Sequence, residues 1–253
     1  MNRSLNNFRR FKLFAFLLLI GLLLHSCFIT SLYPFYTKDL IHFEKQLIGQ
    51  WSDSEGGLWK VMRYIDFNNG YFDLKKKDTV DMNEKKTEFY HLLKQFYMVE
   101  FESNNSTFSH QGIPLKDAVY FLAVPFKINH HLFLDLTPHH KGTATNSSNS
   151  PIVMTMPSNS SSHKIDTHSL AKVDMDSKNQ ITITWLTEEK INALLDAHKI
   201  KIKYEKTGVK GKTLLTTSSE ELVEFIKKYM NSKNGDRWDS DENQKLKFQL
   251  KRR

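Results

Sequence analysis

The residue types that could do chemistry in this sequence are one cysteine, a group of histidines and a few carboxylates. Cys27 is the only cysteine among 253 residues, and it closely follows an uncharged apolar run. A deprotonated thiol is a nucleophile and a metal ligand. Because a single thiol cannot form a disulfide within its own chain, Cys27 must have another use or none.

The histidines raise the question of a metal site. Neutral imidazole binds zinc, and three converging ligands would make a site. Adjacent histidines on a strand point to opposite faces, however, and the H-E-x-x-H motif does not occur. We therefore expect solvated loop and edge histidines, no metal and no cofactor. The residues concerned are His130, His131, His139, His140, His163 and His168.

Other catalytic patterns are also missing from the sequence. Asp174-x-Asp176 resembles the start of a calcium loop, but Lys178 occupies the next ligand position and the distal glutamate is missing. No G-x-S-x-G motif occurs either. We expect a non-catalytic protein with no catalytic residues.

The first 26 residues have the pattern of an export signal. Arg3, Arg9, Arg10 and Lys12 form a basic start, and Leu13 to Leu24 follow without a polar side chain. Twelve helical residues span only ~18 Å, which is short of the ~30 Å hydrocarbon core. A cleaved signal peptide over residues 1–26 is therefore favoured over an uncleaved signal-anchor.

The residues that end this segment are Leu24-His25-Ser26-Cys27. They resemble a bacterial lipobox, which is leucine, two mostly small residues and cysteine. The resemblance implies that the Cys27 thiol carries a diacylglyceryl group and that the signal is cut before it. Two or three acyl chains would hold the protein firmly on the membrane. The alternative is an ordinary signal peptide with an incidental cysteine.

The composition of the remaining chain narrows the partners. Removal of residues 1–26 leaves 227 residues and takes four basic residues away, so the formal net charge falls from +8 to +4. An exported chain without a basic motif of interleaved aromatics is not expected to bind nucleic acid. A weak preference for anionic lipid is compatible with the remaining charge. The aromatic content of 12% favours a core built from β-structure.

A Gly-x-Trp motif opens the predicted β-structure. Gly49-Gln50-Trp51 resembles the first-strand signature of the lipocalins. In that family the tryptophan closes the base of an up-and-down barrel whose mouth holds an apolar ligand. The resemblance implies a ligand site with Trp51 and Trp59 near its floor. A different curved antiparallel sheet covered by C-terminal helices explains the same pattern.

Strand and turn signals recur after this motif. Residues 57–67 are apolar-rich and predict a strand. Asn68-Asn69-Gly70 is typical of a turn, and residues 71–80 would form the returning strand. Residues 87–103 read as one or two strands or as partly helical. Residues 117–138 predict two strands joined near 127–130, with an edge or bulge at Pro125. Residues 168–186 predict a hairpin.

Two C-terminal helices follow the strands. Thr187 begins the first, and Ser218-x-x-Glu221 is a capping box for the second. A short strand is expected between them at 201–206. The apolar residues alternate at 246, 248 and 250, which allows a terminal strand or a membrane-touching tail in an otherwise polar end.

These signals define the predicted organisation of the chain. The fold class is β-rich α+β, with a curved antiparallel sheet or lipocalin-like barrel and two C-terminal helices. The predicted ranges are a signal peptide at 1–26, a lipid-attached tether or first covering segment at 27–46, a β-rich domain at 47–232 with a flexible insertion at 141–162, and a polar tail at 233–253.

Three stretches together resemble a group of uncharacterised bacterial lipoproteins: Leu47–Trp51, Leu132–Pro138 and Ser218–Ile226. We expect a location in the bacterial cell envelope, with the outer membrane favoured, and the uncharged residues after Cys27 carry no sorting signal that identifies the membrane. The resemblance to this group brings no activity with it. Our leading hypothesis is a lipid-anchored, non-catalytic module that holds a small apolar ligand. The alternative is a structural lipoprotein that contacts another envelope protein and has no ligand cavity. A cavity of at least ~300 Å³ lined by aromatics would favour the former.

Overall fold

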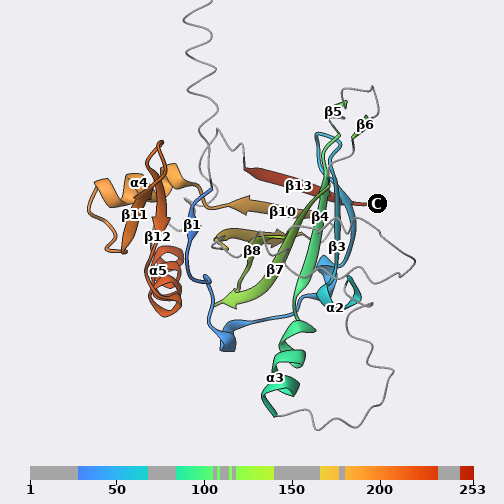
Figure 1. The fold of residues 1–253 in the computed structure, drawn as a ribbon, viewed down its shortest axis with the longest axis horizontal. Helices are drawn as coiled ribbons and strands as arrows, with labels where there is room; N and C mark the ends of the chain where they lie inside the picture. The colour runs from blue at the N-terminus through green and yellow to red at the C-terminus, as the bar shows by residue number, and fades with distance from the viewer. Residues whose placement is uncertain are drawn as a thin grey trace, which may run out of the picture.

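Eight antiparallel strands close into a barrel in the computed structural model, which describes residues 28–67, 84–104, 107–108, 114–115, 118–139, 166–176, 180–232 and 246–253. Each strand pairs with its neighbour along the chain, and the last pairs back onto the first (Figure 1). The strands are β2 (Gly49–Ser52), β3 (Leu58–Arg63), β4 (Tyr97–Glu102), β7 (Ala118–Ile128), β8 (His131–His139), β9 (His168–Met175), β10 (Gln180–Trp185) and β13 (Lys247–Arg252). The predicted fold class is confirmed.

Alternation along these strands fills the barrel. Leu132, Leu134 and Leu136 of β8 point inward, as do Ile181, Ile183 and Trp185 of β10, because side chains at i and i+2 share a face. The inward rows of the other strands complete one apolar cluster. Closing the ring also removes free sheet edges, which would otherwise be open to pairing with other chains.

The sheet branches at β9. Its first residues, His168 and Ser169, pair with the two-residue strand β1 (Thr30–Ser31), whereas Ala171–Met175 pair with β10. β1 continues the branch to β12 (Lys212–Leu215) and β11 (Tyr204–Thr207). A second apolar cluster forms where the outer barrel wall meets this branch, and α5 (Ser219–Asn231) contributes five buried residues to it.

Both predicted C-terminal helices are present. Thr187 caps α4 (Glu188–Asp196) by accepting a hydrogen bond from the backbone N–H of Lys190. Ser218 caps α5 in the same way through the N–H of Glu221. The short strand expected between the helices is β11, and it begins three residues later than predicted.

The hairpins agree with the sequence in most places. β7 and β8 are joined at Asn129 and His130, as expected. Pro125 lies beyond the stretch of β7 that pairs with β4, which ends at Ala123, so its missing N–H interrupts no ladder there. β9 and β10 form the predicted hairpin.

Residues 87–103, for which the sequence allowed either strands or a partial helix, contain one of each. The first part lies in α3 (Glu84–Leu93), and the second part is β4. The strand expected over residues 57–67 stops at Arg63, because Tyr64–Phe67 form the four-residue helix α2. A small two-stranded sheet, β5 (Thr107–Phe108) and β6 (Pro114–Leu115), lies between β4 and β7 in the chain.

Neither end of the described chain hangs free. Residues 28–46 run along the outside of the barrel through η1 (Lys38–Leu40) and η2 (Lys45–Leu47), and Ile29 and Phe35 are buried there. They cover the second cluster instead of forming a tether. At the other end, β13 fills the gap between β10 and β2, so residues 247–252 form a strand and not a tail. Residues 1–27, 68–83 and 140–165, which include the signal, Cys27 and the predicted insertion, lie outside the described ranges.

Candidate functional site

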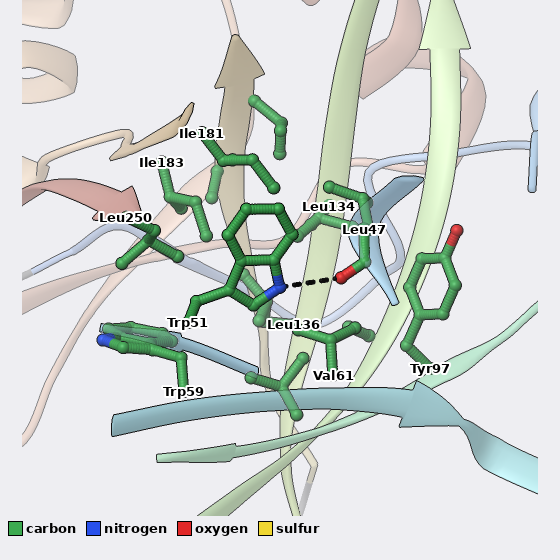
Figure 2. Close-up of a cluster of buried hydrophobic side chains, with 14 of the residues drawn as sticks. Leu47, Trp51, Trp59, Val61, Tyr97, Leu134, Leu136, Ile181, Ile183 and Leu250 are labelled. Carbon is green, nitrogen blue, oxygen red and sulfur yellow. Dashed lines mark hydrogen bonds between the residues drawn. The ribbon is translucent and has the colours of Figure 1, made fainter. Parts of the chain in front are cut away.

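The two tryptophans predicted to line a ligand site do lie inside the barrel. The side chains of Trp51 and Trp59 are 2% and 4% exposed, and their strands pair so that the two residues are opposite each other. Trp51 donates its ring N–H to the carbonyl of Leu47 at 3.0 Å (Figure 2). Trp59 donates to Asp53 Oδ2 at 2.9 Å.

The interior around these tryptophans is filled. Trp59 contacts the rings of Phe101, Trp185 and Phe248, with centroids 4.6 to 6.1 Å apart. The remaining void between the inward side chains measures only about 20 Å³. Such a space holds about one water molecule and no organic ligand. The barrel core is therefore a packed core and not a ligand cavity.

Arg252 covers the outer end of Trp51. Its guanidinium lies 4.4 Å from the Trp51 ring centroid and donates to the carbonyls of Gln46 and Ile48. A glycine suits position 49 because its backbone φ of +150° disfavours other residues, and an added Cβ would displace the flexible end of Arg252, whose Nη1 would be 2.9 Å away. The Gly-x-Trp motif thus joins the first and last barrel strands.

A second hollow lies outside the barrel, along α5. It is a groove of about 740 Å³ between α5 and the segment that follows α4. This volume is within the range of small-molecule sites. We call it the α5 groove. Its lining residues are Leu194, His198, Lys199, Ile200, Lys201, Ile202, Thr217, Glu220, Glu221, Glu224, Phe225, Lys228, Tyr229 and Ser232.

The end of α4 forms one wall of the α5 groove. His198 has a φ of +53°, and its N–H donates to the carbonyl of Leu195, while the N–H of Lys199 donates to that of Leu194. These two bonds form a Schellman motif, which stops the helix and turns the chain. Residues 199–203 then run outside any helix or strand, with Ile200 and Ile202 half-buried.

The α5 groove combines an apolar floor with a charged rim. Phe225 and Tyr229 are buried at one turn's spacing on α5, with ring centroids 5.8 Å apart. Lysine side chains of the rim, Lys199, Lys201 and Lys228, are exposed and form no ion pair with any residue that the structure describes.

The carboxylates of the rim are already occupied in part. Glu221 accepts from the Thr217 hydroxyl and lies in the α5 cap, and these bonds lower its pKa. Glu224 accepts from Lys227 at 2.9 Å, which lowers the pKa of Glu224. Partnered carboxylates beside lysines without an ion pair suit an amphipathic guest with an anionic group.

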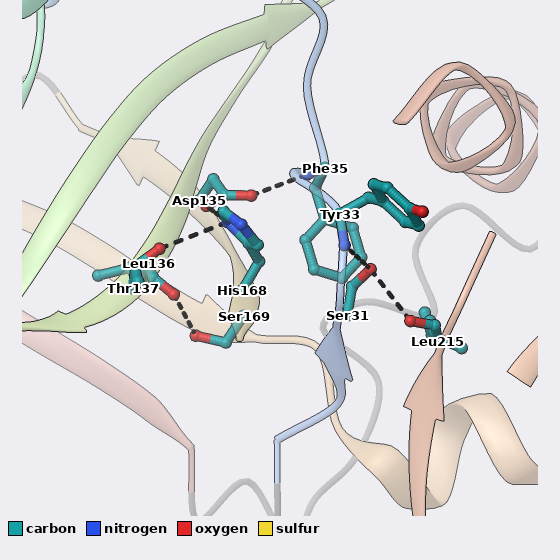
Figure 3. A network of polar contacts seen from close by, with 9 residues as sticks. All are labelled: Ser31, Tyr33, Phe35, Asp135, Leu136, Thr137, His168, Ser169 and Leu215. Carbon is teal, nitrogen blue, oxygen red and sulfur yellow. Dashed lines mark hydrogen bonds and ion pairs between the residues drawn. The ribbon is translucent and has the colours of Figure 1, made fainter. Parts of the chain in front are cut away.

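A buried carboxylate that the sequence analysis did not single out lies behind the N-terminal segment. Asp135 of β8 is fully buried, and its Oδ2 accepts from the N–H of Phe35 at 2.7 Å (Figure 3). Its Oδ1 lies 2.7 Å from His168 Nδ1. Burial raises the pKa of Asp135 despite both partners. The signal in the sequence was a lone aspartate within the apolar run of residues 132–136.

The Asp135–His168 pair holds structure together, and the Thr137 hydroxyl lies 3.4 Å from the same His168 Nδ1. Ser169, the nearest serine in the chain, donates its hydroxyl to the carbonyl of Leu136 at 3.2 Å. Ser31 donates to the carbonyl of Leu215. The pair and these serines fix β1 and residues 33–35 against the outer wall. His168 was expected to be solvated, and it is instead largely buried and paired.

The remaining predicted sites give little further chemistry. Asp174 pairs with Lys172, and Asp176 accepts from the backbone N–H of Gln180, so both serve the β9–β10 hairpin. The rings of His130 and His131 contact each other at a tilt of 42°, with centroids 3.9 Å apart. Within the described ranges, no three histidine, cysteine or carboxylate side chains are grouped closely enough to hold a metal ion. No described helix has the length and apolarity to cross a bilayer.

Comparison of the chain with protein-family models, with curated protein sequences and with solved structures gives no significant match.

Proposed function

We propose that this chain is a lipid-anchored, non-catalytic binding module of the bacterial cell envelope. It holds a small amphipathic ligand in the α5 groove. The observation that carries the ligand proposal is the contrast between two spaces: about 740 Å³ along α5 and about 20 Å³ inside the barrel. A guest of drug or fatty-acid size fits only the first.

The chemistry of the groove defines the class of ligand. The apolar part of the guest lies on Phe225, Tyr229 and the half-buried isoleucines, whereas its anionic group meets Lys199 or Lys228. In this proposal Trp51 and Trp59 belong to the barrel core, are not part of the groove lining and do not touch the ligand. The barrel is lipocalin-like in its meander and its Gly-x-Trp start, but its ligand site has moved outside.

The anchor is the part of the proposal that comes from the sequence. Cys27 follows a basic start and a short apolar run, and a diacylglyceryl thioether explains why one thiol occurs and no other. The module would then be held on a membrane, with the outer membrane favoured. Radiolabelled palmitate should enter the wild-type protein and not Cys27→Ser. Equal labelling of both proteins, or none, would remove the anchor from the proposal.

Ligand binding is tested with a dansylated fatty acid as probe. Ile202→Trp fills part of the groove, so we expect about tenfold weaker probe binding, equivalent to the loss of one or two buried methylenes. The matched control is Val119→Trp, which adds the same bulk at an exposed position at the start of β7, outside the lining of the groove. Equal affinity in wild type, Ile202→Trp and Val119→Trp would refute the groove as the site.

One observation favours a second function. The filled barrel leaves the fold without the internal cavity that defines a carrier, as expected for a structural lipoprotein that contacts another envelope protein. Native mass spectrometry of the protein purified from its own host separates the two proposals. A co-purifying small molecule supports ligand binding, and a stoichiometric protein partner supports the structural role.

A further inference from the structure

The pairing of β1 fixes which surface lies beside Phe28, the residue that follows Cys27 in the chain. β1 runs parallel to β12, with Thr30 opposite Leu214 and Ser31 opposite Leu215. Two residues earlier, Phe28 is therefore level with Lys212, where β12 begins. The turn that joins β11 to β12 lies immediately beyond this level. Figure 1 shows the start of β1 beside this hairpin.

Almost no slack separates Cys27 from the folded body. Phe28 forms a bridge with Thr187, and the N–H of Ile29 donates to the carbonyl of Leu186 at 2.9 Å. Ile29 is completely buried. Consecutive Cα atoms are only ~3.8 Å apart, so a lipid on Cys27 starts within one residue of this surface. A domain held so closely cannot tumble freely over its membrane.

The tip of the β11–β12 hairpin has the side chains for a membrane contact. Val209 is fully exposed, and its side chain is more exposed than that of any other large apolar residue that the structure describes. Gly208 and Gly211 have φ values of +66° and +61° and shape the turn that presents it. An added Cβ at either glycine would meet nothing within 4 Å, so the tip is open on all sides.

The charges around Val209 are mostly positive. Residues 204–215 contain three lysines, Lys206, Lys210 and Lys212, and one carboxylate, Glu205. The Lys206 ammonium donates to the Thr213 hydroxyl in β12 and to the Asn192 side chain in α4. Lys210 forms no ion pair with any described residue. An apolar tip flanked by lysines fits the boundary between acyl chains and anionic headgroups.

We propose that the tip of the β11–β12 hairpin, residues 208–211, contacts the bilayer that holds the lipid on Cys27. Val209 enters the headgroup boundary, and Lys210 and Lys212 lie against lipid phosphates. The inference depends on the proposed anchor, because the anchor alone brings the tip to a bilayer. The hairpin then sets the orientation of the domain and keeps the α5 groove at a fixed height above the membrane.

The test uses the full chain, processed by a lipoprotein-producing host, with Val209→Cys as the labelling site. A lipidated Cys27 has no thiol, so an environment-sensitive nitrobenzoxadiazole label attaches at position 209 alone. The protein is reconstituted into phosphatidylethanolamine–phosphatidylglycerol vesicles with or without headgroup spin labels. The matched control is His130→Cys, an exposed position in the turn after β7, where the neighbouring Asn129 hydrogen-bonds to Asn231 at the C-terminal end of α5.

We expect a blue-shifted emission for the label at 209 and at least about twofold stronger quenching by spin-labelled lipid than at 130. Equal emission and quenching at the two positions would overturn the hairpin contact while leaving the anchor intact. The intact mass distinguishes the other failure: two labels on the Val209→Cys protein mean that Cys27 is a free thiol, and the anchor and this inference both fall.

Discussion

At the residue scale, Asp135 is the group whose environment differs most from water. Its carboxylate is buried against the outer barrel wall, where it accepts from the Phe35 N–H and meets His168. A charge in such a place is retained only with good partners, and removing a partner costs more than the pair contributes. Asp135 therefore couples the N-terminal segment to β8 and β9.

Asp135 should make stability depend on pH. Because burial raises its folded-state pKa above the unfolded value of about 3.9, the native state binds the proton more tightly than the unfolded chain. The free energy of unfolding should thus fall as pH rises from the unfolded pKa through the folded one. Asp135→Asn should remove this fall, because the amide keeps an acceptor for Phe35 and titrates no proton.

Urea unfolding at a series of pH values measures this effect. The matched control is Asp174→Asn, which removes a half-exposed carboxylate paired with Lys172. A pH profile for Asp135→Asn that parallels the wild type, with the control also parallel, would show that the buried carboxyl does not titrate with a raised pKa.

At the element scale, the stop of α4 stores strain that can be measured. His198 has a φ of +53°, which costs a residue with a Cβ about 1 kcal/mol relative to glycine. His198→Gly should therefore raise the free energy of unfolding by about 0.5–1 kcal/mol. Ala197→Gly, one residue earlier at a φ of −79°, should lower it. Destabilisation by both glycines would contradict the Schellman geometry.

Closure of the barrel depends on β13. Leu250 is 1% exposed within the interior cluster, whereas Gln249 points outward. Leu250→Ala should lower the free energy of unfolding by about 2–5 kcal/mol, and Gln249→Ala should change it by less than about 0.5 kcal/mol. Equally small effects of the two substitutions in thermal or urea unfolding would mean that this strand does not close the barrel.

The individual helices and hairpins were easier to predict from the sequence than the strand pairing that closes the barrel. The caps at Thr187 and Ser218 and the β7–β8 and β9–β10 hairpins follow from local rules, and all are confirmed. The pairing of β13 with β2 joins residues two hundred apart, and no local pattern in 247–252 specifies its partner. The α3 helix was only one of two readings because its apolar spacing continues directly into β4.

At the scale of the whole molecule, the site was harder to predict than the fold. Trp51 and Trp59 were predicted to line a ligand site, and they lie buried inside the barrel. Sequence spacing does not reveal how completely neighbours fill the space around them. The α5 groove arises from the turn at His198, the direction of residues 199–203 and the exposed face of α5. Its walls come from separate elements whose meeting depends on tertiary packing.

We propose that the ligand binds in the α5 groove and not in the barrel. The most direct measurement is photo-crosslinking of a diazirine-bearing fatty acid to the full protein, followed by peptide mapping. We predict adducts on residues 194–202 and 220–232, and their loss in Ile202→Trp. Adducts on the inward residues of β3, β8 or β10, unaffected by Ile202→Trp, would contradict the account.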